Sequence, residues 1–349
     1  MKKLKILILL HPDLIPPNNV ESKKIFTEKY VAWKTEYDVI SGLRELGHEI
    51  LILGVDRNFD ELEEILNSIK VDLVFNLLEQ FNNQSELDYK VAEFLEERNI
   101  PFTGCQSKAL KISRDKAASK SVVAKSGVKT PKYSVFRKLR KVNLKKFNLQ
   151  FPVIVKSLSE EASYGISKKS VVRNDKALLK RIKYMHEKLK VDCIVEEFIE
   201  GEELYVGAMG GHDNVMLSPR KLHFLTSINP NLEIYTERAK WSVAYSRKNK
   251  IRTRHKAANK LLLKRLHHEV KIICESLQIR GQVRVDFRVK ESGEIYFLEA
   301  NPNPNIAVDD DFCLAALRKY KNYPTVLSEV IKIAFENHKK KIGRYKKVA

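Results

Sequence analysis

Residues 295–305 read IYFLEANPNPN, an apolar strand that ends in polar groups and prolines. Side chains two residues apart in a strand point to the same face, so Glu299 and Asn301 share one face at the end of this strand. The prolines stop the strand and stiffen the chain that follows. Two oxygen ligands held side by side suit a hard cation such as magnesium. An ordinary strand exit with a capping asparagine explains the same letters, and this stretch alone does not decide between the two.

The composition is that of a globular protein with two or three lobes. The chain has 349 residues, more than one hydrophobic core usually holds, and 43% of them are hydrophobic. No apolar run reaches the ~20 residues of a membrane-spanning helix, so we expect no membrane association. The start, MKKLKILILL, has the basic lead and apolar run of a signal peptide, but the run is short and no small-residue cleavage site follows. We therefore expect a first buried strand there.

The cysteines and the charge distribution indicate the cellular compartment and the kind of partner to expect. The four cysteines show no metal or redox spacing, which fits a reduced, cytoplasmic compartment. The net charge of +20 is uneven: residues 111–150 hold 13 lysines and arginines against one acid, and residues 331–349 hold seven against one. Such segments attract polyanions, although a coding bias toward lysine explains them equally. Because we find no nucleic-acid-binding motif, we expect no nucleic-acid partner and keep a large acidic acceptor as one option.

The first hundred residues alternate apolar strands with amphipathic helices, which is typical of a parallel sheet covered on both faces. We expect its strands at 5–10, 48–55, 71–78 and 100–104. Ligands of such sheets bind beyond the carboxyl ends of the strands, so residues 11–19 and 79–85 are the expected functional loops.

After two short helices within 106–130, the pattern changes to an α+β arrangement with mostly antiparallel strands. We expect strands at 133–136, 151–158, 165–172 and 192–199, a helix near 174–190, a strand pair over 203–219 that turns at 210–214, a long helix near 255–278, a hairpin over 281–301 that turns at 291–293, and a last helix at 325–337.

The hairpin over 281–301 carries the strongest site candidates. Arg284 and Asp286 are two residues apart and share a face, and Glu299 and Asn301 come from the partner strand. Two carboxylates and an amide at adjacent strand ends can hold one or two magnesium ions, and an arginine beside them fits a phosphate group. A simple charge pair between Arg284 and Asp286 is the alternative, but it leaves Asn301 unexplained.

Lysines and a small-residue loop point to phosphate as well. Lys156 ends the apolar strand VIVK, where a cation is costly unless it meets an anion, and Lys116 opens a helix in SRDKAASK. The loop LSEEASYGISK contains Ser163 and Gly165 and resembles a mobile loop over phosphates. Many hairpins have similar loops, so this pattern is weak by itself.

The stretch VEEFIEGEEL, residues 195–204, has the character of a chain that crosses between two lobes. The backbone of Phe198 and Ile199 could meet an adenine edge, and Glu203 could accept ribose hydroxyls. A solvated linker explains the five glutamates equally well when the stretch is read in isolation.

Taken in this order, these residues resemble the ATP-grasp superfamily and, within it, the D-alanine–D-alanine ligase branch. The stretch 100–131 is similar to that branch in order and spacing, and the resemblance runs from about residue 36 to 305. It implies an α/β and α+β fold of three parts. These are a pre-ATP domain with a parallel sheet over 1–105, a central ATP-grasp subdomain over 106–195, and a C-terminal subdomain over 196–349 with the metal site and a basic tail.

The resemblance also implies roles for matching residues. The nucleotide site would consist of Lys116, Lys156, Gly165, Glu196, Glu197, Phe198, Ile199 and Glu203, in which the lysines meet ATP phosphates, Glu196 the adenine amino group and Glu203 the ribose. Magnesium would be bound by Asp286, Glu299 and Asn301, as two ions, with manganese as an alternative. The catalytic residues would be Arg284, Lys240, Ser163 and Asn305.

The implied activity is ATP-dependent ligation of a carboxylate to an amine through an acyl phosphate. Two segments depart from the family, because residues 10–20 lack its glycine-rich loop and glutamate, and residues 76–85 lack its His-Gly. We therefore expect amino acid or peptide substrates other than D-alanine, with Glu79, Gln80 and Glu86 favouring a cationic group. A D-alanine–D-alanine ligase is the alternative. A non-catalytic ATP-binding regulator or a nucleic-acid-associated protein is the alternative of another class, and a homodimer is one option for assembly.

Overall fold

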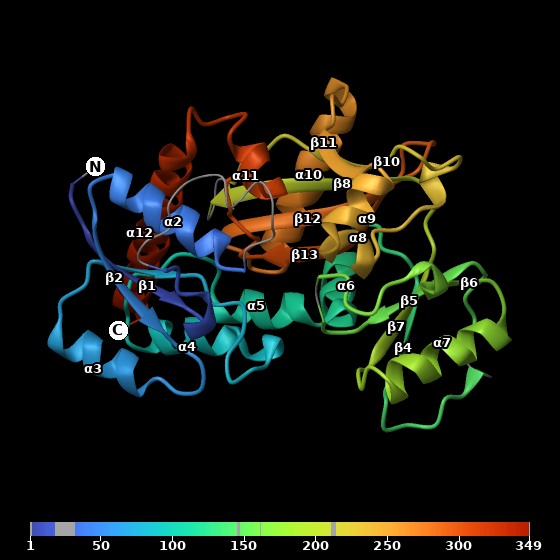
Figure 1. Ribbon diagram of the computed structural model, residues 1–349, viewed down its shortest axis with the longest axis horizontal. Helices are drawn as coiled ribbons and strands as arrows, with labels where there is room; N and C mark the ends of the chain where they lie inside the picture. Colours follow the sequence, from blue (N-terminus) through green and yellow to red (C-terminus); the bar gives the residue numbers. More distant parts are fainter. Residues whose placement is uncertain (1, 18–31, 145–146, 161, 211–213, 349) are drawn as a thin grey trace.

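A computed structural model of the chain describes residues 2–17, 32–144, 147–160, 162–210 and 214–348. Three sheets follow one another along the sequence and lie side by side in the molecule (Figure 1). The expected loop 11–19, the turn 210–214 and the two basic segments each lie partly outside the described residues or side chains.

The N-terminal sheet is parallel, as predicted, with the order β2-β1-β3. Its strands are β1 (Lys5–Leu10), β2 (Glu49–Gly54) and β3 (Leu73–Asn76). Residues 6–10 of the central strand are fully buried, because helices cover both faces of the sheet. These helices are α2 (Lys34–Glu45), α3 (Asp60–Ser68), α4 (Tyr89–Glu97) and α12 (Tyr323–Val348) (Figure 1).

The fourth strand expected at 100–104 is wrong. Only Phe102 forms a bridge there, to Val74 of β3. Pro101 offers no backbone N–H to a ladder, and Gly104 adopts a φ of +99°, so the chain leaves the sheet at once. The Asn303 amide oxygen accepts the Cys105 N–H at 2.7 Å. A Cβ at Gly104 would lie only 2.7 Å from the same oxygen, so glycine leaves room for this contact.

The central sheet is antiparallel, with the order β4-β7-β5-β6. Its strands are β4 (Tyr133–Phe136), β5 (Val153–Ser157), β6 (Val171–Val172) and β7 (Cys193–Glu197). The helix α7 (Asp175–Glu187) buries Leu178 and Ile182 against one face of this sheet. The strand expected at 165–172 is shorter than predicted, because a 3-10 turn, η4 (Lys168–Ser170), precedes β6 and only Val171 and Val172 form a strand.

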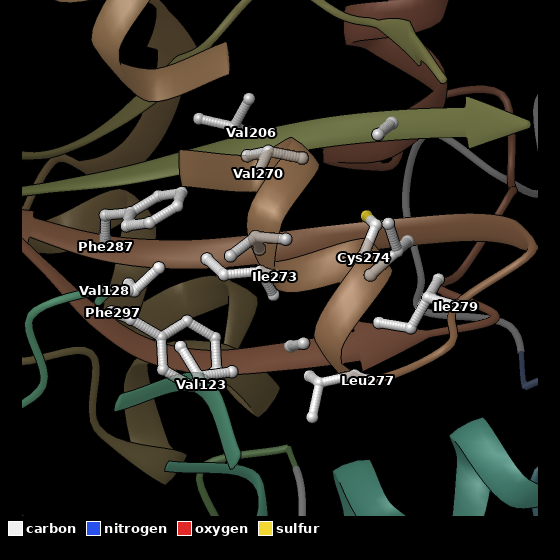
Figure 2. Packing of buried hydrophobic residues seen from close by; sticks show 14 of the residues in the cluster. Val123, Val128, Val206, Val270, Ile273, Cys274, Leu277, Ile279, Phe287 and Phe297 are labelled. Carbon is white, nitrogen blue, oxygen red and sulfur yellow. The ribbon is translucent and has the colours of Figure 1, made fainter. Parts of the chain in front are cut away.

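The C-terminal sheet is the largest, with the order β11-β10-β8-β12-β13 and β9 paired to β8. Its strands are β8 (Glu202–Gly210), β9 (Val215–Met216), β10 (Arg220–Phe224), β11 (Ile251–His255), β12 (Gly281–Val289) and β13 (Ile295–Pro302). The helix α10 (Lys260–Ser276) packs Ile273 toward Phe287 and Phe297 of the sheet (Figure 2). Val123 of α6 (Lys116–Lys125) joins the same core (Figure 2).

Several elements between and after these strands were not predicted. They are β10, β11, α8 (Glu237–Trp241), α9 (Val243–Lys248) and α11 (Asp311–Ala316). The two short helices that the sequence did predict within 106–130 are α5 (Ser107–Arg114) and α6. Within the described residues, no helix is both long and apolar enough to cross a lipid bilayer. The domain boundaries at 105 and 195 stay a prediction.

Candidate active site

A cavity of about 380 Å³ lies between the central and C-terminal sheets and is bordered by the loop after β3. Both sheets contribute strand ends to its wall, which is why charged side chains accumulate there. The predicted site residues that line it are Lys116, Lys156, Ser163, Glu196, Glu197, Phe198, Ile199, Glu203, Lys240, Arg284, Asp286, Glu299, Asn301 and Asn305. Gly165 is not part of the lining, although its neighbours Tyr164 and Ile166 are. Of the residues expected to favour a cationic substrate, Glu79 lines the cavity, whereas Gln80 and Glu86 do not.

The acidic end of the cavity is built by the β12–β13 ladder. Asp286 pairs directly with Glu299, and Arg284 pairs with Asn301. The Arg284 guanidinium donates two hydrogen bonds to the Asp286 carboxylate, at 2.8 and 2.9 Å. This is the charge pair that the sequence offered as the alternative, and it coexists with the shared face of Glu299 and Asn301.

These residues form a donor set that fits magnesium. Glu299 and Asn301 line the cavity together with Asp286, and carboxylate and amide oxygens are the ligands that hard cations prefer. The Asn301 amide nitrogen donates to the Arg284 carbonyl at 3.4 Å, which turns its oxygen away from that contact. Among the described residues, no group of three histidines, cysteines or acids is arranged to hold a metal. The Asn301 amide as a third ligand stays a prediction.

The two carboxyl groups differ in electrostatic environment. Burial raises the pKa of Asp286 to about 7, although the adjacent Arg284 opposes this shift. Burial also acts on Glu299, but Lys116 and Lys156 outweigh it and lower its pKa to about 2. Glu299 is consequently a permanent negative charge within a ring of cations.

Three lysines converge on two glutamates at the basic end. Lys156 lies 3.0 Å from Glu196, and Lys116 lies 3.6 Å from Glu299. Lys120 lies 3.2 Å from Glu196, is fully buried, and also donates to the carbonyl of Leu298. Sequence reasoning missed Lys120, although its spacing of four from Lys116 places both on one face of α6.

The stretch 195–204, which connects the central and C-terminal sheets and is called the hinge below, differs in detail from its predicted role at the adenine edge. The Phe198 N–H donates to the Pro152 carbonyl at 3.1 Å, so this N–H is not available to an adenine edge. Glu196 is 1% exposed and shared by two lysines, and its contact with an adenine amino group stays a prediction. Glu203 accepts from the Tyr205 hydroxyl at 2.9 Å.

Arg288 organises this hinge, and sequence reasoning did not single it out. It is 4% exposed and donates to the backbone carbonyls of Gly201 at 3.2 Å and Asn231 at 3.0 Å. Its guanidinium also donates to the Glu203 carboxylate at 3.0 Å. One side chain thus links the predicted ribose ligand, Glu203, to the backbone of Gly201 and Asn231.

The small-residue loop after β5 is tied to the segment that carries Lys240. The Gly165 N–H donates to the Glu237 carboxylate at 3.1 Å, and the Glu237 N–H donates to the Ile166 carbonyl at 2.9 Å. Ser163 adopts a φ of +60°, a left-handed conformation that a non-glycine residue takes at some cost. Loop and α8 therefore border the cavity as one unit, which brings Ser163 and Lys240 to the same space.

The basic segment 111–150 does not form one charged surface. Lys116 lines the cavity, and Lys129 and Arg137 form ion pairs with acids of other segments. Residues 145–146 lie outside the described part of the chain. Much of the charge that the sequence displays as a strip is therefore used within the molecule.

Comparison with known proteins adds to this geometry. A sequence model described as "D-ala D-ala ligase C-terminus" matches residues 122–332. The D-alanine–D-alanine ligase of Aquifex aeolicus is 29% identical over 307 residues, which cover 87% of this chain and 96% of that protein.

Solved structures share the fold. The D-alanine–D-alanine ligase from Bacillus anthracis complexed with ATP has a TM-score of 0.73 and 18% identity, over 97% of this chain and 99% of that chain. The VanG D-Ala:D-Ser ligase from Enterococcus faecalis has a TM-score of 0.67 and 20% identity, over 95% and 100%. The predicted α/β and α+β ATP-grasp fold is thereby confirmed.

Proposed function

Because this chain belongs to the D-alanine–D-alanine ligase family of ATP-grasp enzymes, which form carbon–nitrogen bonds, we propose that it joins the carboxyl group of one D-alanine to the amino group of another. The observation that carries the proposal is the cavity itself. It sets Lys116, Lys156, Lys240 and Arg284 around one space, as a triphosphate requires.

The reaction would proceed in two steps at this cavity. A carboxylate oxygen of the first amino acid attacks the γ-phosphorus of ATP, and the bond to ADP breaks, which yields an acyl phosphate. The amine of the second amino acid then attacks the carbonyl carbon, and inorganic phosphate leaves with the bonding electron pair. Because an acyl phosphate hydrolyses readily, the walls of the cavity must exclude water during both steps.

The side chains of the cavity have distinct tasks in this scheme. Arg284, held by Asp286, would steady the transferred phosphoryl group, and the backbone N–H of Asn305 would face the developing oxyanion. Magnesium, as two ions in our proposal and with manganese as a substitute, would be held by the acidic end and would neutralise phosphate charge. Ser163 and Lys240 would cover the phosphates from the loop and α8.

The choice of D-alanine reverses an expectation from the sequence. The loops after β1 and β3 depart from the family, and this led us to expect another substrate. Several relatives that match along most of the chain carry the name D-alanine–D-alanine ligase, and they favour D-alanine instead. The fold alone leaves the second amino acid open, since one structural neighbour is titled a D-Ala:D-Ser ligase.

The remaining partner predictions carry less weight. A large acidic acceptor was suggested by the basic segment 111–150, but ion pairs such as that between Arg137 and Asp192 use part of this charge internally. The small amino acid therefore remains the proposed acceptor. A homodimer stays a prediction.

The test is product formation by the purified protein with ATP, magnesium and D-alanine. We expect one D-alanyl-D-alanine, one ADP and one phosphate per turnover, measured by mass spectrometry and phosphate release. D-serine, L-alanine and basic amino acids form the comparison panel. ADP release with another amino acid of the panel, and none with D-alanine, would contradict the proposal and restore the expectation from the sequence.

A further inference from the structure

The segment 238–268 carries charge of one sign only. It contains eleven lysines and arginines and no aspartate or glutamate. It runs from α8 through α9 and β11 into the first half of α10, and β11 is an edge strand of the C-terminal sheet (Figure 1). Such a concentration of positive charge at an edge of the fold attracts an anionic partner.

Two arginines of β11 project from one face of the sheet. In the ladder with β10, Arg252 pairs with His223 and Arg254 pairs with Lys221. Side chains two residues apart in a strand share a face, and both arginines are exposed. Burial lowers the pKa of His223, and Lys221 and Arg254 lower it further. The electrostatic potential on this face is therefore positive.

This face of the sheet is the one turned away from the candidate active site. In the ladder with β8, Lys221 pairs with Leu204 and Arg220 pairs with Tyr205. Tyr205 lines the cavity, whereas Leu204 belongs to the core that α10 covers. The two arginines thus share the face of α10. A partner bound there would leave the cavity open to substrates.

Acidic side chains neutralise only part of the charge on this face. Glu202 lies 2.5 Å from the Lys221 ammonium and 2.6 Å from that of Lys256. Four exposed cations form no ion pair within the described part of the chain, and we call them the basic face: Arg252, Arg254, Lys260 and Lys264. Their charges remain available to a partner.

Aliphatic side chains are exposed beside the basic face. The Leu225 N–H donates to the Lys250 carbonyl at 3.4 Å, which extends the pairing of β10 with β11, and Leu225 is 46% exposed. Leu261, in the first turn of α10, is 68% exposed, and Ile228, in the turn after β10, is fully exposed. Cations next to exposed aliphatic side chains are typical of surfaces that bind lipid, because cations meet the head groups and aliphatic groups enter the acyl boundary.

We propose that the basic face and its aliphatic neighbours dock the protein on an anionic lipid surface. Docking of this kind needs no membrane-spanning helix, which was the basis for expecting no membrane association from the sequence. Nucleic acid is the other common polyanion, but single strands stack on aromatic side chains, and the exposed apolar side chains beside this face are aliphatic. The inference does not depend on the proposed function.

Sedimentation of the full chain with lipid vesicles tests the proposal. The vesicles contain phosphatidylglycerol and phosphatidylcholine in equal amounts, or phosphatidylcholine alone. We expect binding to the mixed vesicles only, with release as the salt concentration rises. Arg252→Gln combined with Arg254→Gln should weaken this binding about twentyfold, since each cation near an anionic membrane contributes about fivefold.

The matched control is Lys176→Gln combined with Lys180→Gln, which removes the same charge from exposed positions of α7. This control should bind the mixed vesicles as the parent does. Ile228→Ser combined with Leu261→Ser keeps every charge and should weaken vesicle binding severalfold. None of these six residues lines the cavity, so all three variants should keep the parent's unfolding temperature and its KM for ATP.

Three outcomes would overturn the proposal. The first is a parent protein that does not sediment with the mixed vesicles. The second is a lysine control that loses as much binding as the arginine variant, which would assign the attraction to net charge. The third is a parent that binds a DNA duplex while Ile228→Ser with Leu261→Ser leaves vesicle binding unchanged, which would make the basic face a nucleic-acid surface. Because vesicle binding is measured without turnover, failure of the proposed ligase activity would not affect this test.

Discussion

Asp286 and Glu299 lie directly opposite one another on β12 and β13, yet the pKa values of their carboxyl groups move in opposite directions. Asp286 is buried and is held on both oxygens by Arg284. Glu299 faces Lys116 and Lys156 instead. Glu299 is thus a fixed negative charge, whereas the charge of Asp286 is balanced by the neighbouring guanidinium. Together they form a cavity wall that suits a phosphate group with its metal ion.

We predict that Glu299→Gln and Asn301→Ala each abolish ligase turnover while the fold persists. Each change removes an oxygen ligand or its charge from the proposed magnesium site, and neither residue is part of a hydrophobic core. Turnover measured against magnesium concentration, with circular dichroism as a check of folding, tests this. Glu291→Gln, at the exposed hairpin turn, is the control. Near-normal magnesium-dependent turnover in either variant would remove the metal assignment.

Lys156→Ala should weaken ATP binding by about 2–4 kcal/mol, the usual cost of truncating one member of a buried charge pair. The side chain of Lys156 is 14% exposed and lies 3.0 Å from Glu196, which would keep only Lys120 as its partner. Calorimetric titration with an ATP analogue measures the change. Lys168→Ala is the control, because that side chain is 72% exposed. An unchanged affinity would make Lys156 a structural residue.

Glu36 should make stability depend on pH. Its pKa is raised from 4.5 to about 7, so the folded chain holds this proton more tightly than the unfolded chain does. The resulting stabilisation is complete below pH 4.5 and is lost as the pH rises through about 7. Glu36→Gln removes this loss and should be more stable than the parent at pH 8, by about 1–3 kcal/mol, but not at pH 4.5.

Urea denaturation of both proteins at several pH values checks this difference. The charges that act on Glu36 are Glu79 and Asp38, so Glu79→Gln should lower its pKa and reduce the effect. A difference between parent and variant that is the same at every pH would show that Glu36 does not titrate in this range.

Arg288→Lys should raise the KM for ATP severalfold and change kcat less. A lysine keeps the charge but cannot bond Glu203 and the carbonyls of Gly201 and Asn231 together, so the hinge would lose its alignment. Steady-state kinetics at varied ATP measure the effect, with the exposed Arg173→Lys as the control. A variant that loses thermal stability while its KM for ATP stays unchanged would limit Arg288 to a structural role.

Local sequence patterns were sufficient where the physical cause is itself local. The apolar runs separated by amphipathic helices predicted the parallel sheet, because burial on both faces leaves no polar positions in a strand. The alternation of side chains in β13 was enough to place Glu299 and Asn301 on one face. By contrast, β11 reads IRTRH and was not recognised, since an exposed edge strand has no apolar pattern to display.

The residues that the sequence left unnoticed depend on contacts between distant parts of the chain. Lys120 reaches a carbonyl 178 residues away, and Arg288 meets a carboxylate at a separation of 85. Nothing in the letters around Glu36 indicates that it is buried beside other acids at the wall of a cavity. The sequence determined which groups the chain can offer and which neighbours share a face. Only the tertiary structure decided which charges lose water and which partners they meet, because desolvation and ion pairing depend on distances across the fold.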